Sequence, residues 1–364
     1  MPSRTIVRIL FPLAFLAAAD CAYAAAQRTF VASYGLSANT VFNCSLAKPC
    51  RAFSEAMGVT ASNGEVIVLD SAGYGPVTIV QSVSIVAPPG IYAGVTVSVG
   101  TGITVDGPSI FVTLKGLTVN GQGGADGIAF VQGARLILER CTVTTMTNNG
   151  INVTASGGFT AMDGVVAIGN GVNGVVISGD TGASIVRSRA EGNAISGFLV
   201  ADGATVAIRD SEASRNVLAG LRAETNVAVT TTVSIDGFAA TAGQDGIDVA
   251  APGIGAKTIV DATRANLSEN SVAGLEMYGP SAGGQVIVTV TDSLLAGNGF
   301  LGVTMTAPPT PVWKLTLGGN RIVNTSGTGI RNTNGNGIIL TRGDNTMSGN
   351  APDLSATLTT LNGI

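Results

Sequence analysis

Three ionisable residues recur at near-regular intervals in the second half of the chain. Arg222, Asp248 and Glu276 each lie two positions after a glycine, while Glu224 and Tyr278 lie two residues beyond the first and last of them. If the chain folds back on itself with this period, their backbones stack about 5 Å apart on one face. Carboxylates at that separation could act as an acid and nucleophile pair, with repulsion raising one pKa, or could share a Ca²⁺ ion.

A structural interpretation of the same residues competes with the chemical ones. An outward position on a strand is expected to be polar, and neighbouring opposite charges commonly form a solvated ladder of little energetic value. The sequence therefore favours surface decoration over ligand or Ca²⁺ binding at Asp248 and Glu276, and it places catalysis last. The chain contains no histidine, which excludes Ser-His-Asp and Cys-His catalysis.

A glycine followed by an apolar residue recurs with a period of 23 to 28 residues. After each glycine, apolar and other residues alternate as in a strand with one face buried. A period of this length indicates a solenoid in which equivalent residues of successive coils stack into columns. The recurring pairs are Gly127-Ile128, Gly150-Ile151, Gly174-Val175, Gly197-Phe198, Gly220-Leu221, Gly246-Ile247, Gly274-Leu275, Gly302-Val303 and Gly329-Ile330.

Asparagine marks one turn of the repeat, four residues before the glycine. Stacked amides can bond along the solenoid axis because each has both a donor and an acceptor. The asparagine column is partial, because Met146 and Ala242 interrupt it. A column of mostly small residues precedes each asparagine, or its stand-in Met146, by five positions, which suggests a tight bend. The asparagines are Asn170, Asn193, Asn216, Asn270 and Asn298, and the preceding column holds Cys141, Val165, Ser188, Ser211, Ala265 and Ser293.

These columns predict an all-β fold, a right-handed parallel β-helix of roughly 10 to 12 coils over residues 64–364. A leucine-rich repeat could share the period, but its leucine-dominated signature is absent. The open first coil needs a cover. Residues 25–63 are expected to form this N-terminal cap, with a strand at Thr29-Phe30-Val31 and a short helix after Pro49.

The first residues are typical of a signal peptide. A basic start, an apolar run and Ala22-Tyr23-Ala24 predict cleavage after residue 24 and export to the periplasm or the extracellular space. In an oxidising compartment Cys44 and Cys50 could form a disulfide, whereas two thiols without histidine make a poor metal site. No later apolar stretch is long enough to predict membrane insertion.

The composition limits the classes of binding partner that the sequence supports. The net charge of −4 and the absence of a basic stripe give no electrostatic basis for nucleic-acid binding. With 45% hydrophobic and 12% charged residues, the chain can bury much of itself and is not expected to be disordered. The sequence does not determine the oligomeric state.

The coils and their asparagines resemble the right-handed parallel β-helix repeats of the pectin-lyase-like superfamily. The opening Thr29-Phe30-Val31 and the segment Pro49-Cys50-Arg51-Ala52-Phe53 resemble the N-terminal cap of secreted bacterial members of unknown function. The resemblance implies a fold shared by polysaccharide lyases, hydrolases, epimerases, adhesins and phage tailspikes. The Gly-His-Gly and Arg-Ile-Lys segments of polygalacturonase-like members are missing, and no pectate-lyase motif can be transferred by residue.

Two functional hypotheses follow. The favoured one is a non-catalytic extracellular binding or display module with a possible polysaccharide ligand, contacted by Arg222, Glu224, Asp248, Glu276 and Tyr278. The alternative is a polysaccharide lyase or glycoside hydrolase with catalytic residues among Arg222, Asp248 and Glu276, where Tyr278 could stack on a sugar ring. Aromatic residues make up only 5% of the chain, with a single tryptophan, which weakens the alternative.

Overall fold

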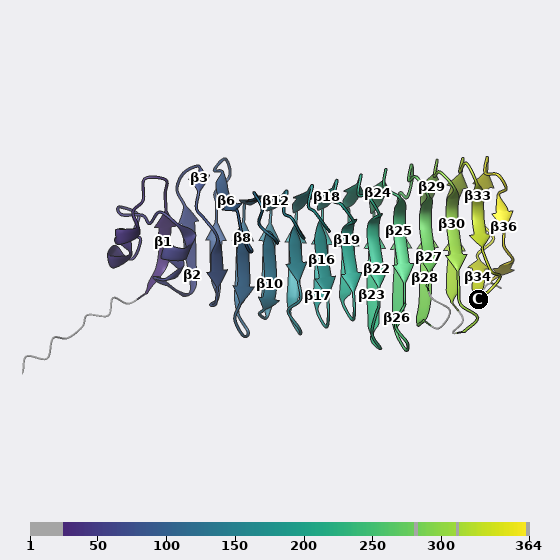
Figure 1. The fold of residues 1–364 in the computed structure, drawn as a ribbon, viewed down its shortest axis with the longest axis horizontal. Helices are drawn as coiled ribbons and strands as arrows, with labels where there is room; N and C mark the ends of the chain where they lie inside the picture. The colour runs from purple at the N-terminus through teal and green to yellow at the C-terminus, as the bar shows by residue number, and fades with distance from the viewer. Residues whose placement is uncertain (1–24, 280–282, 311–312, 362–364) are drawn as a thin grey trace, which may run out of the picture.

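The computed structural model describes residues 25–279, 283–310 and 313–361, so the predicted signal peptide lies outside the described residues. The chain winds into a long parallel β-helix whose coils follow one another along a single axis (Figure 1). No helix in the described ranges is long and apolar enough to cross a membrane.

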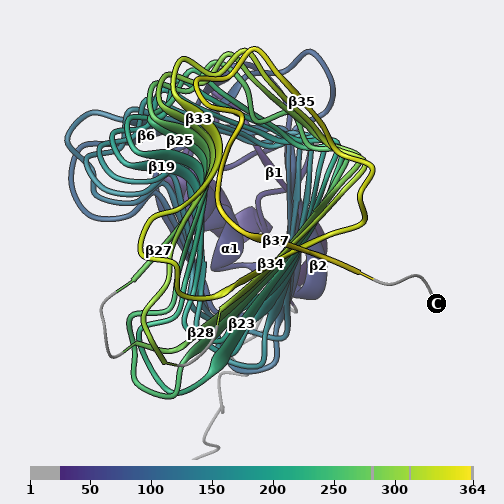
Figure 2. The ribbon, with the colours of Figure 1, turned by 90° about the vertical axis from the view of Figure 1, so that its right-hand side faces the viewer.

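Most coils contribute three strands, one to each of three walls that we call sheets A, B and C (Figure 2). In the coil of β26 and β27, sheet B is represented only by the bridge residue Asn266. Sheet A has 14 strands, sheet C has 12, and sheet B consists of an eight-stranded and a three-stranded part. These numbers agree with the predicted 10 to 12 coils and confirm the all-β solenoid. Strand β2 (Thr60–Val68) begins three residues before the predicted end of the cap at residue 63.

The strands within each sheet pair in parallel with the strands of the preceding and following coils. Sheet A consists of β1 (Ala26–Val31), β2, β5 (Val83–Val86), β8 (Phe111–Lys115), β11 (Arg135–Glu139), β14 (Phe159–Asp163), β17 (Gly182–Val186), β20 (Thr205–Arg209), β23 (Thr230–Asp236), β26 (Lys257–Thr263), β28 (Gln285–Thr291), β31 (Lys314–Gly318), β34 (Ile338–Thr341) and β37 (Leu358–Thr360). Sheet B consists of β3 (Ala72–Gly73), β6 (Ala93–Val97), β9 (Leu117–Gly121), β12 (Thr142–Thr144), β15 (Val166–Ile168), β18 (Arg189–Glu191), β21 (Glu212–Ser214) and β24 (Ala239–Thr241), followed by β29 (Leu294–Ala296), β32 (Arg321–Val323) and β35 (Thr346–Ser348). Sheet C consists of β4 (Val77–Ile79), β7 (Ile103–Asp106), β10 (Ile128–Gln132), β13 (Ile151–Val153), β16 (Val175–Ser178), β19 (Ser196–Ala201), β22 (Ala219–Glu224), β25 (Asp245–Ala250), β27 (Ala273–Tyr278), β30 (Leu301–Thr306), β33 (Thr328–Asn332) and β36 (Leu354–Ser355).

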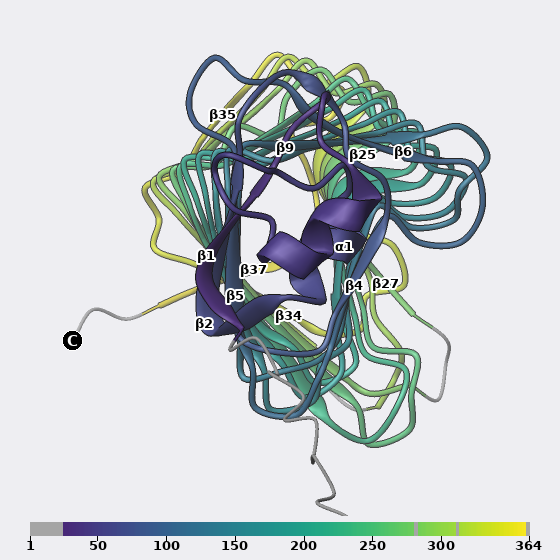
Figure 3. The ribbon, with the colours of Figure 1, turned by 90° about the vertical axis from the view of Figure 1, so that its left-hand side faces the viewer.

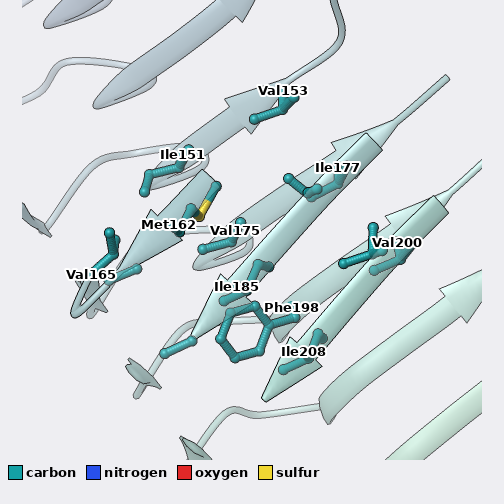
Figure 4. Close-up of a cluster of buried hydrophobic side chains, with 14 of the residues drawn as sticks. Ile151, Val153, Met162, Val165, Val175, Ile177, Ile185, Phe198, Val200 and Ile208 are labelled. Carbon is teal, nitrogen blue, oxygen red and sulfur yellow. The ribbon is translucent and has the colours of Figure 1, made fainter. Parts of the chain in front are cut away.

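Inward-facing aliphatic side chains of the three sheets fill the interior of the solenoid. Ile151, Val175 and Phe198 stack on successive coils of sheet C, and Met162 and Ile185 face them from sheet A (Figure 4). The alternation predicted after each repeat glycine is confirmed by this column of buried residues.

The repeat glycines are required by the close approach of successive coils. A Cβ atom on Gly150 would lie 2.6 Å from the carbonyl oxygen of Gly174, and a Cβ atom on Gly174 would lie equally close to that of Gly197. The same Cβ positions would lie 2.8 Å from the amide nitrogens of Asn170 and Asn193. The glycine and the asparagine of the repeat are therefore fitted to each other across the coil interface.

The predicted asparagine ladder is confirmed. Asn170 donates its backbone N–H and its Nδ2 to Oδ1 of Asn193, at 3.0 and 2.9 Å, and Asn193 donates in the same way to Asn216. All three side chains are buried. Since these bonds run along the axis, the ladder adds side-chain hydrogen bonds to the backbone bonds between coils.

The N-terminal end of the solenoid is closed by a cap. Helix α1 (Phe53–Met57) lies across the end of the first coils, with Phe53, Ala56 and Met57 buried against the core (Figure 3). A 3₁₀ helix, η1 (Ser37–Phe42), precedes it. Cys44 and Cys50 form a disulfide with their Cα atoms 4.9 Å apart, and the described cysteine that remains free, Cys141, is buried.

Replacing Asn193 with alanine is expected to lower the free energy of unfolding by about 2–4 kcal/mol. The substitution removes the hydrogen bonds to both neighbouring asparagines and leaves buried amide groups without partners. Urea unfolding followed by circular dichroism measures the loss. Asn226→Ala is the matched control, because Asn226 is exposed and is expected to cost less than about 1 kcal/mol. Equal losses in the two variants would contradict a stabilising role for the ladder.

Candidate functional site

Sheet C brings the sequence-predicted residues together in the predicted register. Arg222 on β22 pairs with Asp248 on β25, and Asp248 pairs with Glu276 on β27. The same position continues as Thr304 on β30 and Arg331 on β33. We call Arg222, Asp248, Glu276, Thr304 and Arg331 the sheet C row. Their strand neighbours on both sides are core residues such as Leu221 and Ala223, so the row faces outward.

The row is more buried than the sequence analysis expected, and the interpretation as a solvated ladder is wrong for its centre. Asp248 is 2% exposed and Thr304 is 1% exposed, although both face outward. Longer side chains on the flanking strands, Arg222 and Glu276, lie on either side of Asp248 and are themselves only partly exposed. The charge at Asp248 is therefore desolvated, which a fully exposed strand position would not impose.

Arg222 connects the row to Glu224 and Tyr278, which occupy the next outward position along their strands. Its Nε and Nη2 lie 2.9 and 2.7 Å from Oε2 of Glu224, and Nη2 also donates to the hydroxyl of Tyr278 at 3.0 Å. The distance from Nε to Oδ2 of Asp248 is longer, 3.7 Å. Glu224 and Tyr278 flank Ala250 in the register, as predicted. Tyr278 is half-buried, so only part of its ring is available to a ligand.

Three buried polar atoms of the row have no hydrogen-bond partner among the described residues. They are Oδ1 of Asp248, Oγ1 of Thr304 and Nε of Arg331. Buried polar groups are nearly always bonded in folded proteins, so each of these atoms needs a partner such as an ordered water or a bound molecule. Thr304 and Arg331 were not selected as site residues from the sequence. Their position two residues after the repeat glycine was the available signal.

Burial controls the ionisation of the row. It raises the pKa of Asp248 to about 8, and the charges of Asp245, Glu276 and Glu224 add to this increase, while Arg222 opposes it. The ion pair with Arg222 is too long to offset the desolvation. Burial also raises the pKa of Glu276, where Arg331 opposes the shift. At neutral pH Asp248 therefore carries a proton for much of the time and can donate a hydrogen bond.

Asp245 is a further acidic residue beside the row that the sequence analysis did not select. It lies directly before the repeat glycine Gly246, and its Oδ1 accepts a hydrogen bond from the backbone N–H of Ala273 on the next coil. Burial and the charge of Glu276 raise its pKa to about 6. Asp126 and Asn149 make the equivalent bond earlier in the chain, so a polar residue before the glycine was a readable signal.

The row offers acid and base chemistry more readily than metal binding. A protonated Asp248 next to the Glu276 carboxylate is an arrangement that can donate and accept protons. Ca²⁺ takes six to eight oxygen ligands. The described residues contain no group of three or more His, Cys, Asp or Glu side chains placed to hold a metal ion. Asp248 and Glu276 supply two carboxyl groups of such a set, and Ca²⁺ binding at these residues stays a prediction.

A second group of charges lines a surface hollow of about 640 Å³ on sheet A and its adjoining turns. Arg264 and Asp236 form an exposed ion pair there, and Arg209, Asp261 and Asp292 also line the hollow. None of these five residues has a buried unpartnered polar atom. The sheet C row differs from this hollow in that respect, although buried unpartnered atoms also occur outside the row, at Thr160, Ser196, Thr325 and Asn332.

The middle of the chain, residues 93–249, matches a protein family described as "Right handed beta helix region". The chain is a right-handed parallel β-helix. The match covers β6 to most of β25 and confirms the handedness predicted from the repeat. No curated protein matches the sequence.

Solved structures support the same fold. The A-module of the mannuronan C-5 epimerase AlgE4 from Azotobacter vinelandii superposes with a TM-score of 0.63 and 18% identity, covering 81% of this chain and 91% of that one. The AlgE6 A-module from the same organism superposes with a TM-score of 0.56 and 16% identity, covering 85% of this chain and 94% of that one. The periplasmic alginate epimerase AlgG superposes with a TM-score of 0.56 and 10% identity, covering 82% of this chain and 77% of that one. These likenesses show the same β-helix fold.

The buried acidic residues predict that stability falls as pH rises. Because the pKa of Asp248 lies near 8, above the usual 3.8, the folded state binds more protons than the unfolded state between about pH 4 and pH 8. At pH 8, Asp248→Asn is therefore expected to have a free energy of unfolding higher than that of the wild type by on the order of a few kcal/mol, and to unfold at a higher urea concentration. At pH 4 the two proteins should differ little.

Urea titrations of both proteins across this pH range measure the effect. Asp163→Asn is the matched control, because Asp163 is an exposed carboxylate on sheet A. A stability difference between wild type and Asp248→Asn that stays constant with pH would contradict the desolvated carboxyl.

Proposed function

We propose that this protein is exported and binds an extended polysaccharide along sheet C, with the sheet C row as its central contact. The observation that carries this proposal is the set of buried, unpartnered polar atoms at Asp248, Thr304 and Arg331. A sugar polymer supplies closely spaced hydroxyl, ring-oxygen and carboxyl groups that can complete these bonds. The parallel stacking repeats the contact positions about every 4.8 Å, which suits a chain molecule better than a compact ligand.

The charges of the row favour sugars that carry carboxylates. Arg331 makes no ion pair within 4 Å in the described residues, and its guanidinium lies at the end of the row. A free guanidinium next to hydrogen-bond donors is a favourable site for a carboxylate. Solved β-helices of similar fold include proteins named for mannuronan and alginate, which supports the same ligand class.

Export is part of the proposal because the predicted signal peptide and a Cys44–Cys50 disulfide point in the same direction. Disulfides form and persist in oxidising compartments. The name of the AlgG relative places that protein in the periplasm, which is compatible with a periplasmic or extracellular location here.

A second candidate function is acid and base catalysis on the same polymer, as a lyase, a glycoside hydrolase or an epimerase. The pKa of Asp248, near 8, favours it, because a carboxyl that holds a proton at neutral pH can act as a general acid. Glu276, on the adjacent strand, would act as the partner carboxylate. Arg222 would keep Tyr278 and Glu224 in place through its hydrogen bonds.

Binding is tested by calorimetry or a glycan array with uronic-acid polysaccharides and neutral polysaccharides, each with and without Ca²⁺. We expect retention of a uronic-acid polymer. Arg331→Gln and Asp248→Ala should each weaken binding by about tenfold or more, because the first removes a guanidinium group and the second removes a carboxyl group that the ligand contacts.

Arg264→Gln is the control, since Arg264 forms its ion pair on sheet A, away from the row. If no polysaccharide is retained at millimolar concentration, or if the row variants bind as tightly as the wild type, the proposal fails.

Turnover separates the two candidates. The same polymers are incubated with the wild type and followed for unsaturated ends, reducing ends and changed sugar configuration by NMR. Catalysis by the row predicts activity that disappears in the double variant Asp248→Ala, Glu276→Ala and persists in Asp163→Asn. Activity that survives the double substitution would place the reaction elsewhere, and binding without turnover would leave the first candidate.

A further inference from the structure

The two ends of the solenoid are finished differently. At the N-terminal end, the outer edge of β1 is occupied by the disulfide loop: the N–H of Phe30 donates to the carbonyl of Cys44 at 2.8 Å, and the carbonyl of Phe30 accepts from the N–H of Cys50 at 2.9 Å. Helix α1 covers the core behind it (Figure 3). This end therefore offers no continuous free strand edge.

The last described coil has no such cover. Strands β35, β36 and β37 each pair with a single neighbour of the preceding coil, and no helix crosses this end (Figure 2). The core is also open here: Met347, Ala356 and Leu358 are only partly buried, and Leu354 is 39% exposed. An open edge beside an exposed core is a surface on which another strand can pair.

Charges that normally protect a sheet edge are missing from this coil. Asp353 is the only charged residue in residues 345–361. Its Oδ1 accepts hydrogen bonds from the backbone N–H and the Nδ2 of Asn350, so it is already paired within the turn. Two copies of this end can therefore approach without like-charge repulsion, which natural edge strands commonly use to prevent pairing.

The direction in which the backbone N–H and C=O groups of β37 point shows which residues can bond to a further strand. The N–H of Leu361 donates to the carbonyl of Thr341, on the β34 side. Because backbone groups alternate sides along a strand, those of Leu358 and Thr360 point away from β34, where no described residue bonds to them. The N-terminal edge of a second copy cannot pair with these groups, because its described strand edge is occupied by the disulfide loop. The last coil of a second copy has the same outward backbone groups and can pair with them.

We propose that two copies of this chain associate through their last coils, with β37 of each copy pairing antiparallel across a two-fold axis at Thr359. Leu358 of one copy and Thr360 of the other then exchange N–H···O bonds, and the partly exposed core residues of both copies are covered. A two-fold contact closes after two copies and does not propagate into a filament. Sheet A becomes continuous through both solenoids.

Covalent trapping tests the geometry. Antiparallel pairing centred on Thr359 places the two Thr359 Cα atoms about 4.5 Å apart, within reach of a disulfide. We expect Thr359→Cys to form a dimer on a non-reducing gel that reducing agent dissolves. Thr205→Cys, which puts a thiol at an exposed position on β20, and the wild type are the controls and should remain monomeric on the gel.

Light scattering after size-exclusion chromatography tests the association itself. The wild type is expected to have twice the chain mass at high micromolar concentration. Thr360→Pro removes an N–H that points away from β34, so it should raise the dimer dissociation constant at least tenfold without unfolding the chain, whereas Thr360→Ser should not. A wild type that is monomeric at millimolar concentration, or a dimer that Thr359→Cys does not trap and Thr360→Pro does not weaken, overturns the proposal.

Discussion

Parallel stacking of successive coils in register is the constraint on which this structure depends. Every strand of a sheet bonds to the strand of the next coil, so a residue is placed directly above the residue at the same position of the repeat. Close contact between the coils follows: at the repeat glycines, a single Cβ atom would collide with the next backbone. Asparagine ladders are possible for the same reason, since an amide can bond to its equivalent only if the coils repeat at the strand spacing.

The same constraint explains how coils of different length share one register. Spacings between repeat glycines increase from 23 to 28 residues along the chain. Strand pairing nevertheless continues without a shift from Arg222 to Asp248 and Glu276. Extra residues are accommodated in the turns, such as the segment between β25 and β26, and in the sheet A strands β23, β26 and β28, which have seven residues where β20 has five. The coil can therefore vary at its corners and along sheet A while the positions on sheet C stay aligned.

At the sheet C row, this regular stacking costs folding free energy. An ideal solenoid would place residues on sheet C whose polar groups are all satisfied. Instead, the stacking forces Asp248 between two long charged neighbours, where it loses water and gains only a long ion pair. Asp245 and Glu276 add like charge nearby. Such a local conflict costs folding free energy, and proteins commonly retain it where a ligand or a reaction uses the group.

Most of the fold could be predicted from the sequence, because residues at equivalent positions of a repeat occupy equivalent positions in successive coils. The glycine period, the alternation after each glycine and the asparagine column together determine that equivalent residues stack, and from this follow the parallel sheets, the ladder of Asn170, Asn193 and Asn216, and the membership of Arg222, Asp248 and Glu276 in one row. The cap helix was predicted from Pro49, because proline is common near the start of a helix.

Only the tertiary structure decided the chemical state of the row. The sequence places a side chain on a face, but burial, the hydrogen bond from Arg222 to Tyr278 across 56 residues, and the unpartnered atoms of Thr304 and Arg331 depend on side-chain directions and on neighbours from other coils. A pattern of period two predicts which residues face outward. It does not determine how much solvent reaches them, because exposure depends on the volume of every side chain around the position.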